Sequence, residues 1–166
     1  GLNAIGRGHL TVEDSTMYGD SLISFRSDYG STWEGDLEIR NCRWIPSAGA
    51  TSWPRLINVR NDGMHDFGYP CSMPDDVTID GLFVDDANTP DDYEGMYLFT
   101  DPDESNNSVD EITPTPQRPF PYAVCRKVTV RDLTTTSGKK PMLSPGTRMS
   151  DNTVVVDDNT VAVEQE

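Results

Sequence analysis

The chain has 166 residues, 35% of them hydrophobic, and a formal net charge of −15 at pH 7. That length suits one domain with a buried core. The negative charge argues against binding nucleic acid through a basic face, and it disfavours adhesion to anionic membranes, so we expect neither partner. With 13 Gly and 12 Pro, the composition predicts short strands joined by turns, with little helix.

A six-residue pattern recurs along the chain. Its first and third places are apolar and share one face of an extended strand. Five copies begin at Leu10, Leu37, Val77, Val128 and Val154. We expect the third places to stack in one interior column: Val12, Ile39, Ile79, Val130 and Val156. The fifth places are Asp14, Asn41, Gly81, Asp132 and Asp158, residue types that tolerate a left-handed backbone, and we expect the chain to bend there.

Each copy is followed by a second apolar stretch. Residues 22–28 and 56–62 share Leu, Ile, Arg and Asp at equal places, which indicates internal duplication. Residues 96–99, 142–143 and 161–163 are the corresponding second strands of the later copies. Residues 101–124 contain five prolines, so no regular strand is expected there. The sequence therefore predicts a single domain over 1–166, with a proline-rich loop excursion over 101–124.

The copies start 27, 40, 51 and 26 residues apart. A basic period near 26 residues, with turn residues at fixed offsets, favours an all-β solenoid of about five coils with long inserted loops. The alternative is an antiparallel β-sandwich, which also uses many short strands but does not account for the recurrence.

The segment Leu37-Glu38-Ile39-Arg40-Asn41-Cys42 resembles a rung of a right-handed parallel β-helix of the pectate-lyase-like superfamily. In that family, Asn, Asp or Gly corners stack from coil to coil and aliphatic residues fill the interior. The resemblance covers residues 9–163 except 101–124, and it implies a right-handed parallel β-helix. Members include polysaccharide lyases and hydrolases, bacterial surface proteins and phage tail-spike or appendage proteins. The paired-Asp and Gly-His-Gly signatures of polygalacturonase-like hydrolases are absent, so we lean against catalysis.

The best candidate site is a repeated Arg-x-Asp motif. Arg26 with Asp28, and Arg60 with Asp62, would form a ladder on one outer face if their coils are in register. Aromatic side chains in the neighbouring loops suit sugar rings. The predicted ligand-binding residues are Arg26, Asp28, Tyr29, Trp33, Arg60, Asp62 and His65. The alternative interpretation is an exposed ladder of salt bridges with aromatics packed back over the fold.

Metal and cysteine chemistry have weaker signals. The acidic stretches 85–86, 91–92 and 101–104 lack the spacing of a calcium loop, so we predict no metal and no cofactor, with Ca²⁺ as the alternative. Cys42, Cys71 and Cys125 make an odd count without CxxC spacing. Cys42 is expected to be a buried free thiol, and a bridge between Cys71 and Cys125 stays open.

We therefore predict a structural and adhesive β-helix domain that recognises surface polysaccharide. The expected setting is an extracellular or phage tail-associated protein, in a homotrimer and with flanking domains of a longer parent chain. The sequence begins at Gly1 rather than Met, and it contains no signal-peptide pattern. One alternative is a polysaccharide lyase or glycoside hydrolase acting on acidic glycans, with Asp28, Asp62, His65 and Asp66 as its site. The other is a spacer module of a bacterial surface protein.

Overall fold

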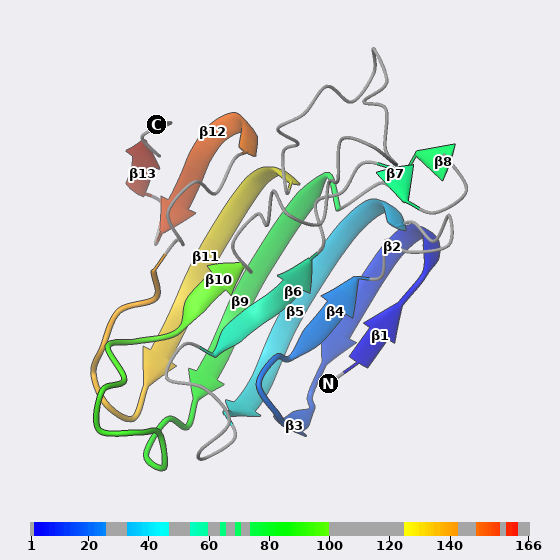
Figure 1. Cartoon of the computed structure of the whole chain (residues 1–166). Coiled ribbons are helices and arrows are strands. Elements are labelled where there is room, and N and C mark those ends of the chain that lie inside the picture. Colours follow the sequence, from blue (N-terminus) through cyan, green and yellow to red (C-terminus); the bar gives the residue numbers. More distant parts are fainter. Residues whose placement is uncertain are drawn as a thin grey trace.

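The structure, a computed structural model, describes residues 2–25, 33–46, 54–59, 64–65, 69–70, 74–99, 125–142, 149–156 and 159–162. These ranges contain strands and no helix (Figure 1), which confirms the all-β prediction for this part of the chain. No helix within the same ranges is long and apolar enough to cross a membrane. The excursion predicted for 101–124 lies outside the described residues.

The larger sheet is built from the recurring pattern. Its strands are β2 (Gly6–Glu13), β3 (Thr16–Tyr18), β5 (Trp33–Ile45), β9 (Asp76–Val84), β11 (Cys125–Thr135), β12 (Met149–Val156) and β13 (Asn159–Ala162). The order across it is β13-β12-β11-β9-β5-β2, with β3 also paired to β5. From β2 to β12 every pairing is parallel, which is not the arrangement of an antiparallel sandwich.

The register of this sheet confirms the predicted stacking of all five positions, and the burial of the first four confirms that they are interior. Val12 pairs with Ile39, Ile39 with Ile79, Ile79 with Val130, and Val130 with Val156. The first four side chains are at most 8% exposed. A one-residue slip would turn every one of these side chains towards the other face of the sheet, so the apolar pattern itself selects the register.

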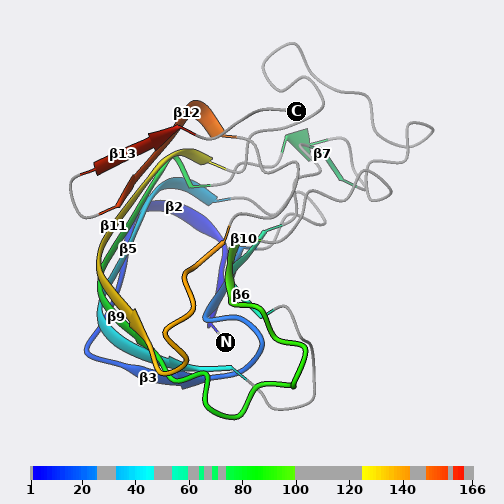
Figure 2. The same ribbon diagram turned by 90° about the vertical axis from the view of Figure 1, so that its left-hand side faces the viewer.

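A smaller parallel sheet carries the second strands. It runs β1-β4-β6-β10, and its strands are β1 (Leu2–Ala4), β4 (Ile23–Phe25), β6 (Arg55–Val59) and β10 (Tyr97–Phe99). Figure 2 shows β5, β9 and β11 lying over one another on one side, with β6 and β10 on the other. Ile23 and Ile57 of the smaller sheet and Ile39 of the larger one have no exposed surface and belong to one core cluster. The hydrophobic core therefore lies between the two sheets.

Four of the predicted corners have the expected backbone. Asp14, Asn41 and Asp132 have φ of 50°, 49° and 48°, and Gly81 has φ of 72°. Asp158 lies outside the described residues. Asn41 also donates a hydrogen bond from Nδ2 to Oδ1 of Asp14 at 2.5 Å. The corner prediction is therefore confirmed at the four described positions.

The end of the chain departs from the prediction. Val161 and Ala162 were expected in the second strand of a fifth copy, but they lie in β13, which pairs antiparallel with β12 in the larger sheet. The reason is the connection, because β12 ends at Val156 and β13 begins at Asn159. So short a link permits a hairpin, whereas a parallel pairing needs a crossover of about a dozen residues or more. In the fourth copy, Met142 forms a parallel bridge with Tyr97, and the rest of the expected second strand lies outside the described residues.

A short antiparallel hairpin joins β7 (Met64–His65) to β8 (Tyr69–Pro70). The two cysteines in the described ranges, Cys42 and Cys125, are buried free thiols. The expectation for Cys42 is thus confirmed, whereas Cys71, the other partner of the alternative bridge, lies outside the described residues. Burial is the main cause that raises the pKa of the Cys125 thiol, which keeps it protonated.

Candidate functional site

The corner changes which side chains face outward. In β5, Ile39 and Cys42 are buried, whereas Arg40 and Asn41 between them are exposed. Two consecutive outward residues reset the alternation of the strand, because the left-handed residue at position 41 bends the chain. After the corner, Arg43 therefore faces outward beside the buried Cys42.

The same reset in neighbouring strands gathers outward side chains on one surface, which we call the post-corner face. It comprises Thr16, Tyr18, Arg43, Ile45, Phe83 and Asp85. Thr16 pairs in register with Arg43, and Arg43 pairs with Phe83. Tyr18 is 69% exposed and Phe83 39% exposed. Two aromatic side chains thus lie open to solvent on a surface of polar and charged groups.

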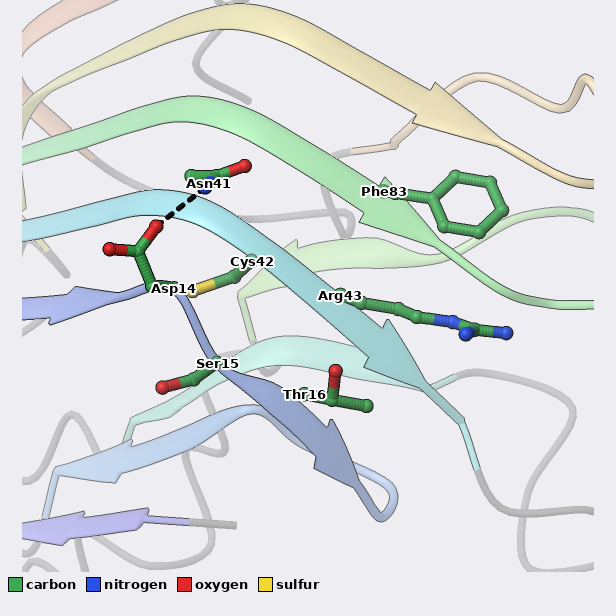
Figure 3. A pocket seen from close by; sticks show the side chains of 7 residues that line it. All are labelled: Asp14, Ser15, Thr16, Asn41, Cys42, Arg43 and Phe83. Carbon is green, nitrogen blue, oxygen red and sulfur yellow. Dashed lines mark hydrogen bonds between the residues drawn. The ribbon is translucent and has the colours of Figure 1, made fainter.

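Beside the corner, this face contains an open depression of about 310 Å³. It is lined by Asp14, Ser15, Thr16, Asn41, Cys42, Arg43 and Phe83 (Figure 3). The figure shows Arg43 and Phe83 projecting from neighbouring strands, while Asp14 and Asn41 mark the corner. Ser15 is held by its own hydroxyl, which donates to the carbonyl of Glu13 at 2.7 Å. The depression therefore offers carboxylate, amide, hydroxyl and guanidinium groups next to an aromatic ring.

Arg43 contacts both a carboxylate and an aromatic ring on the post-corner face. Its guanidinium forms an ion pair with Asp85 and lies 5.7 Å from the centroid of the Phe83 ring. The hydroxyl of Thr136 donates to the other oxygen of Asp85 at 3.3 Å. The hydrogen bond from Arg43, helped by its charge, lowers the pKa of Asp85 below its usual value. Asp85 consequently stays ionised at neutral pH and holds Arg43 in place.

Asp85 is not poised to act as a general acid at neutral pH. A general acid at neutral pH needs a raised carboxyl pKa, and the pKa of Asp85 is lowered instead. Hydroxyl, amide and carboxylate groups beside an exposed ring can hydrogen-bond a sugar while the ring covers its apolar C–H face. Across the described ranges, no group of three or more His, Cys, Asp or Glu side chains is placed to hold a metal ion.

Most of the site predicted from the sequence lies outside the described residues. This holds for Arg26, Asp28, Tyr29, Arg60, Asp62 and Asp66. Phe25 and Val59, which directly precede Arg26 and Arg60, are register partners in β4 and β6. The duplicated stretches are thus aligned up to that point. His65 lies in β7 of the short hairpin.

Trp33 differs from the expectation. It is 7% exposed, and its ring centroid lies 5.8 Å from that of Phe25 at an interplanar angle of 47°. Trp33 starts β5 directly opposite the sheet that carries Phe25, so its large apolar surface fills the core. A buried ring cannot stack on a ligand, and Trp33 therefore has no place in a surface site.

Sequence reasoning missed the post-corner face. Arg43 and Phe83 occupy the same place, two residues after the corner, in two copies of the pattern. The signal was therefore present, but it becomes visible only once the corner is known to reset the alternation. Asp86 was also missed as a structural residue, since its acidic stretch was considered only for metal binding.

Asp86 is 2% exposed and joins two loops. Its carboxylate accepts hydrogen bonds from the hydroxyl of Tyr93 at 2.8 Å and from the backbone and hydroxyl of Ser137 at 2.8 and 2.5 Å. Lys139 adds a hydrogen bond to the carbonyl of Tyr93 and lies 5.0 Å from its ring centroid. These bonds compensate for burying the charge, so Asp86 fixes the loop after β9 against the loop after β11.

Comparison with known proteins gives no relative: no protein family model, no curated protein and no solved structure matches this chain.

Proposed function

We propose that the chain is a right-handed parallel β-helix that serves as an adhesive domain and binds polysaccharide on its post-corner face. The setting we propose is an extracellular or phage tail-associated protein with flanking domains in a longer parent chain. The site in this proposal is the post-corner face, because Trp33 is buried and most other residues of the predicted Arg-x-Asp site lie outside the described residues.

Two features support the β-helix. Repeats follow one another in sequence order across the larger sheet, from β2 to β5, β9, β11 and β12. The second strands follow one another in the smaller sheet in the same direction. A chain that passes between two parallel sheets and advances by one strand at each turn is what a solenoid requires. The stacked corners at Asp14, Asn41, Gly81 and Asp132 also fit the rungs of the pectate-lyase-like β-helices that the sequence resembles.

The observation that carries the binding function is the exposed ring of Phe83 beside the corner depression. The ring is 39% exposed and is flanked by Arg43, whose charge is balanced by Asp85. A balanced ion pair next to an aromatic face provides hydrogen bonds without a strong preference for a charged ligand. Weak binding at one such face gains strength when several copies engage one polymer.

The test is binding of the purified chain to a panel of bacterial surface polysaccharides, before and after Phe83→Ala. We expect the substitution to weaken binding to the best polysaccharide by about five- to tenfold, because one stacking contact is worth on the order of 1 kcal/mol. Ile5→Ala is the matched control, since Ile5 is also exposed (56%) but lies outside the post-corner face.

The outcomes separate the site from the function. Unchanged binding by Phe83→Ala, with normal thermal unfolding, would place the site elsewhere. Failure to bind any polysaccharide in the panel would contradict the adhesive function. Shortening of a polysaccharide by the purified chain would replace it with the lyase or hydrolase alternative.

A further inference from the structure

The post-corner face has a second exposed aromatic ring besides that of Phe83. Tyr18 of β3 is 69% exposed and pairs in register with Ile45 of β5. Two residues earlier, Thr16 of β3 pairs with Arg43 of β5, which pairs with Phe83 of β9. The two aromatic residues are therefore two strands apart across the sheet and two residues apart along it. With about 4.8 Å between strands and about 3.3 Å per residue, their Cα atoms are about 12 Å apart.

The ion pair of Arg43 and Asp85 lies between these two rings. Arg43 is level with Phe83 on the neighbouring strand, whereas Asp85 directly follows β9, two residues beyond Phe83. The backbone N–H of Asp85 still donates to β5, at the carbonyl of Trp44, over 2.8 Å. The ion pair therefore crosses the line that joins Phe83 to Tyr18. Along that line the face offers one ring, then a balanced ion pair, then the second ring.

This surface suits a neutral sugar chain better than a peptide or an anionic polymer. A peptide strand binds to unpaired main-chain groups at a sheet edge, but the main chain of β5 is bonded on both sides, to β3 and to β9. The charge of Arg43 is balanced by Asp85, and the whole chain carries a net charge of −15, which repels anions. A sugar presents an apolar C–H face to a ring and hydroxyl groups to an ion pair.

We propose, building on the polysaccharide-binding function above, that the post-corner face binds a neutral, linear, β-1,4-linked glycan that runs diagonally across β3, β5 and β9. In an extended β-1,4-linked chain each sugar is turned over relative to the one before it, so every second sugar presents the same face. Two such sugars stack on Phe83 and Tyr18, and the sugar between them hydrogen-bonds to Arg43 and Asp85. Because outward side chains stand roughly perpendicular to the sheet, a further strand beside β3 would leave both rings accessible.

Defined oligosaccharides test this directly with the purified chain. The probes are β-1,4-linked oligomers of glucose and of N-acetylglucosamine, from two to six sugars long. Maltohexaose, whose α-1,4 linkages make the chain coil, is the comparison for linkage. NMR titration measures the dissociation constants for wild type, Phe83→Ala, Tyr18→Ala and Tyr18→Phe. Ile5→Ala is the control, since Ile5 is exposed but lies outside the post-corner face.

We expect one or both β-linked hexamers to bind about five- to tenfold more tightly than the corresponding dimer, because only the longer chain reaches both rings. Phe83→Ala and Tyr18→Ala should each remove that gain. For the dimer, each substitution should weaken binding by no more than about twofold, because the dimer stacks on either ring and one site remains. Tyr18→Phe and Ile5→Ala should bind the hexamer as wild type does. Thermal unfolding of each variant checks that it is folded.

Three results would overturn this inference and leave the proposed function standing. The first is no binding of either β-linked series by a chain that does bind a surface polysaccharide. The second is binding of maltohexaose as tight as that of the β-linked hexamers. The third is loss of hexamer binding in Phe83→Ala but not in Tyr18→Ala. Failure to bind any polysaccharide would contradict the proposed function, and this inference with it.

Discussion

At the scale of single residues, the corners decide where the outward surface changes direction. Asp14, Asn41 and Asp132 are the non-glycine residues with positive φ among those described. A short polar side chain tolerates this conformation because it bonds locally and has no branch at Cβ. The residue type at these positions is thus set by the backbone geometry. The same bend changes which of the following side chains face outward.

Replacing Asn41 by Val should lower the free energy of unfolding by about 1–3 kcal/mol, because a β-branched residue is strained at a φ of 49°. The measurement is urea denaturation. Asn41→Gly is the control: it also removes the hydrogen bond to Asp14, but it accepts the backbone conformation. Equal losses for both variants would mean that the hydrogen bond, rather than the backbone, dominates.

The ion pair of Arg43 and Asp85 predicts a dependence of stability on pH. Because its pKa is lowered in the folded state, Asp85 contributes stability that is present above about pH 4, its value in unfolded chains. That contribution is lost as the pH falls through the lower, folded pKa. Urea midpoints between pH 2 and 7 should show wild type above Asp85→Asn at neutral pH, with the difference shrinking below about pH 4. A difference that stays constant down to pH 2 would contradict this assignment.

At the scale of elements, β2 and β5 approach each other closely where Gly8 faces Gly35. Gly35 and Gly8 both have a φ that side chains disfavour, but the space around them differs. A Cβ on Gly35 collides with the backbone of β2, whereas a Cβ on Gly8 meets no described atom within 4 Å. Substitutions at these two positions therefore distinguish the effect of backbone strain from the effect of steric crowding.

Gly8→Ala should lower the free energy of unfolding by about 1–3 kcal/mol through strain at φ alone. Gly35→Ala should lower the free energy of unfolding by about 1–3 kcal/mol more than Gly8→Ala does, because β2 must also shift away from β5. This extra loss is the usual range for an overpacked site. Chemical denaturation of both variants measures the difference. If Gly8→Ala lowers the free energy of unfolding as much as Gly35→Ala, the close approach of the two backbones does not contribute to the loss.

At the scale of the whole molecule, one core joins two parallel sheets. Phe25 of the smaller sheet contacts Trp33 of the larger, and both belong to the cluster that contains Ile39. Most of the large apolar side chains in the described ranges lie in this core. The post-corner face, by contrast, combines the exposed rings of Tyr18 and Phe83 with polar and charged groups.

The sequence by itself determined the recurring strands of the larger sheet, their parallel register and the corners at Asp14, Asn41, Gly81 and Asp132. Period-two alternation specifies which side of a strand is buried, and it does so for Leu37 and Ile39 without knowledge of any neighbour. A residue type that tolerates positive φ, such as Asn41, marks a bend in the same local way. Recurrence of both signals then implied in-register parallel stacking, because equal patterns bury equal faces.

Only the tertiary structure decided which aromatics are exposed and how the last copy ends. Trp33 stands between Thr32 and Glu34 in the sequence and Phe83 between Leu82 and Val84, yet the first is buried against Phe25 of the other sheet and the second faces outward. Asp86 is buried because Tyr93 and Ser137, from loops after different strands, both reach it. These outcomes depend on contacts between residues distant in sequence, and a local pattern carries no information about such contacts.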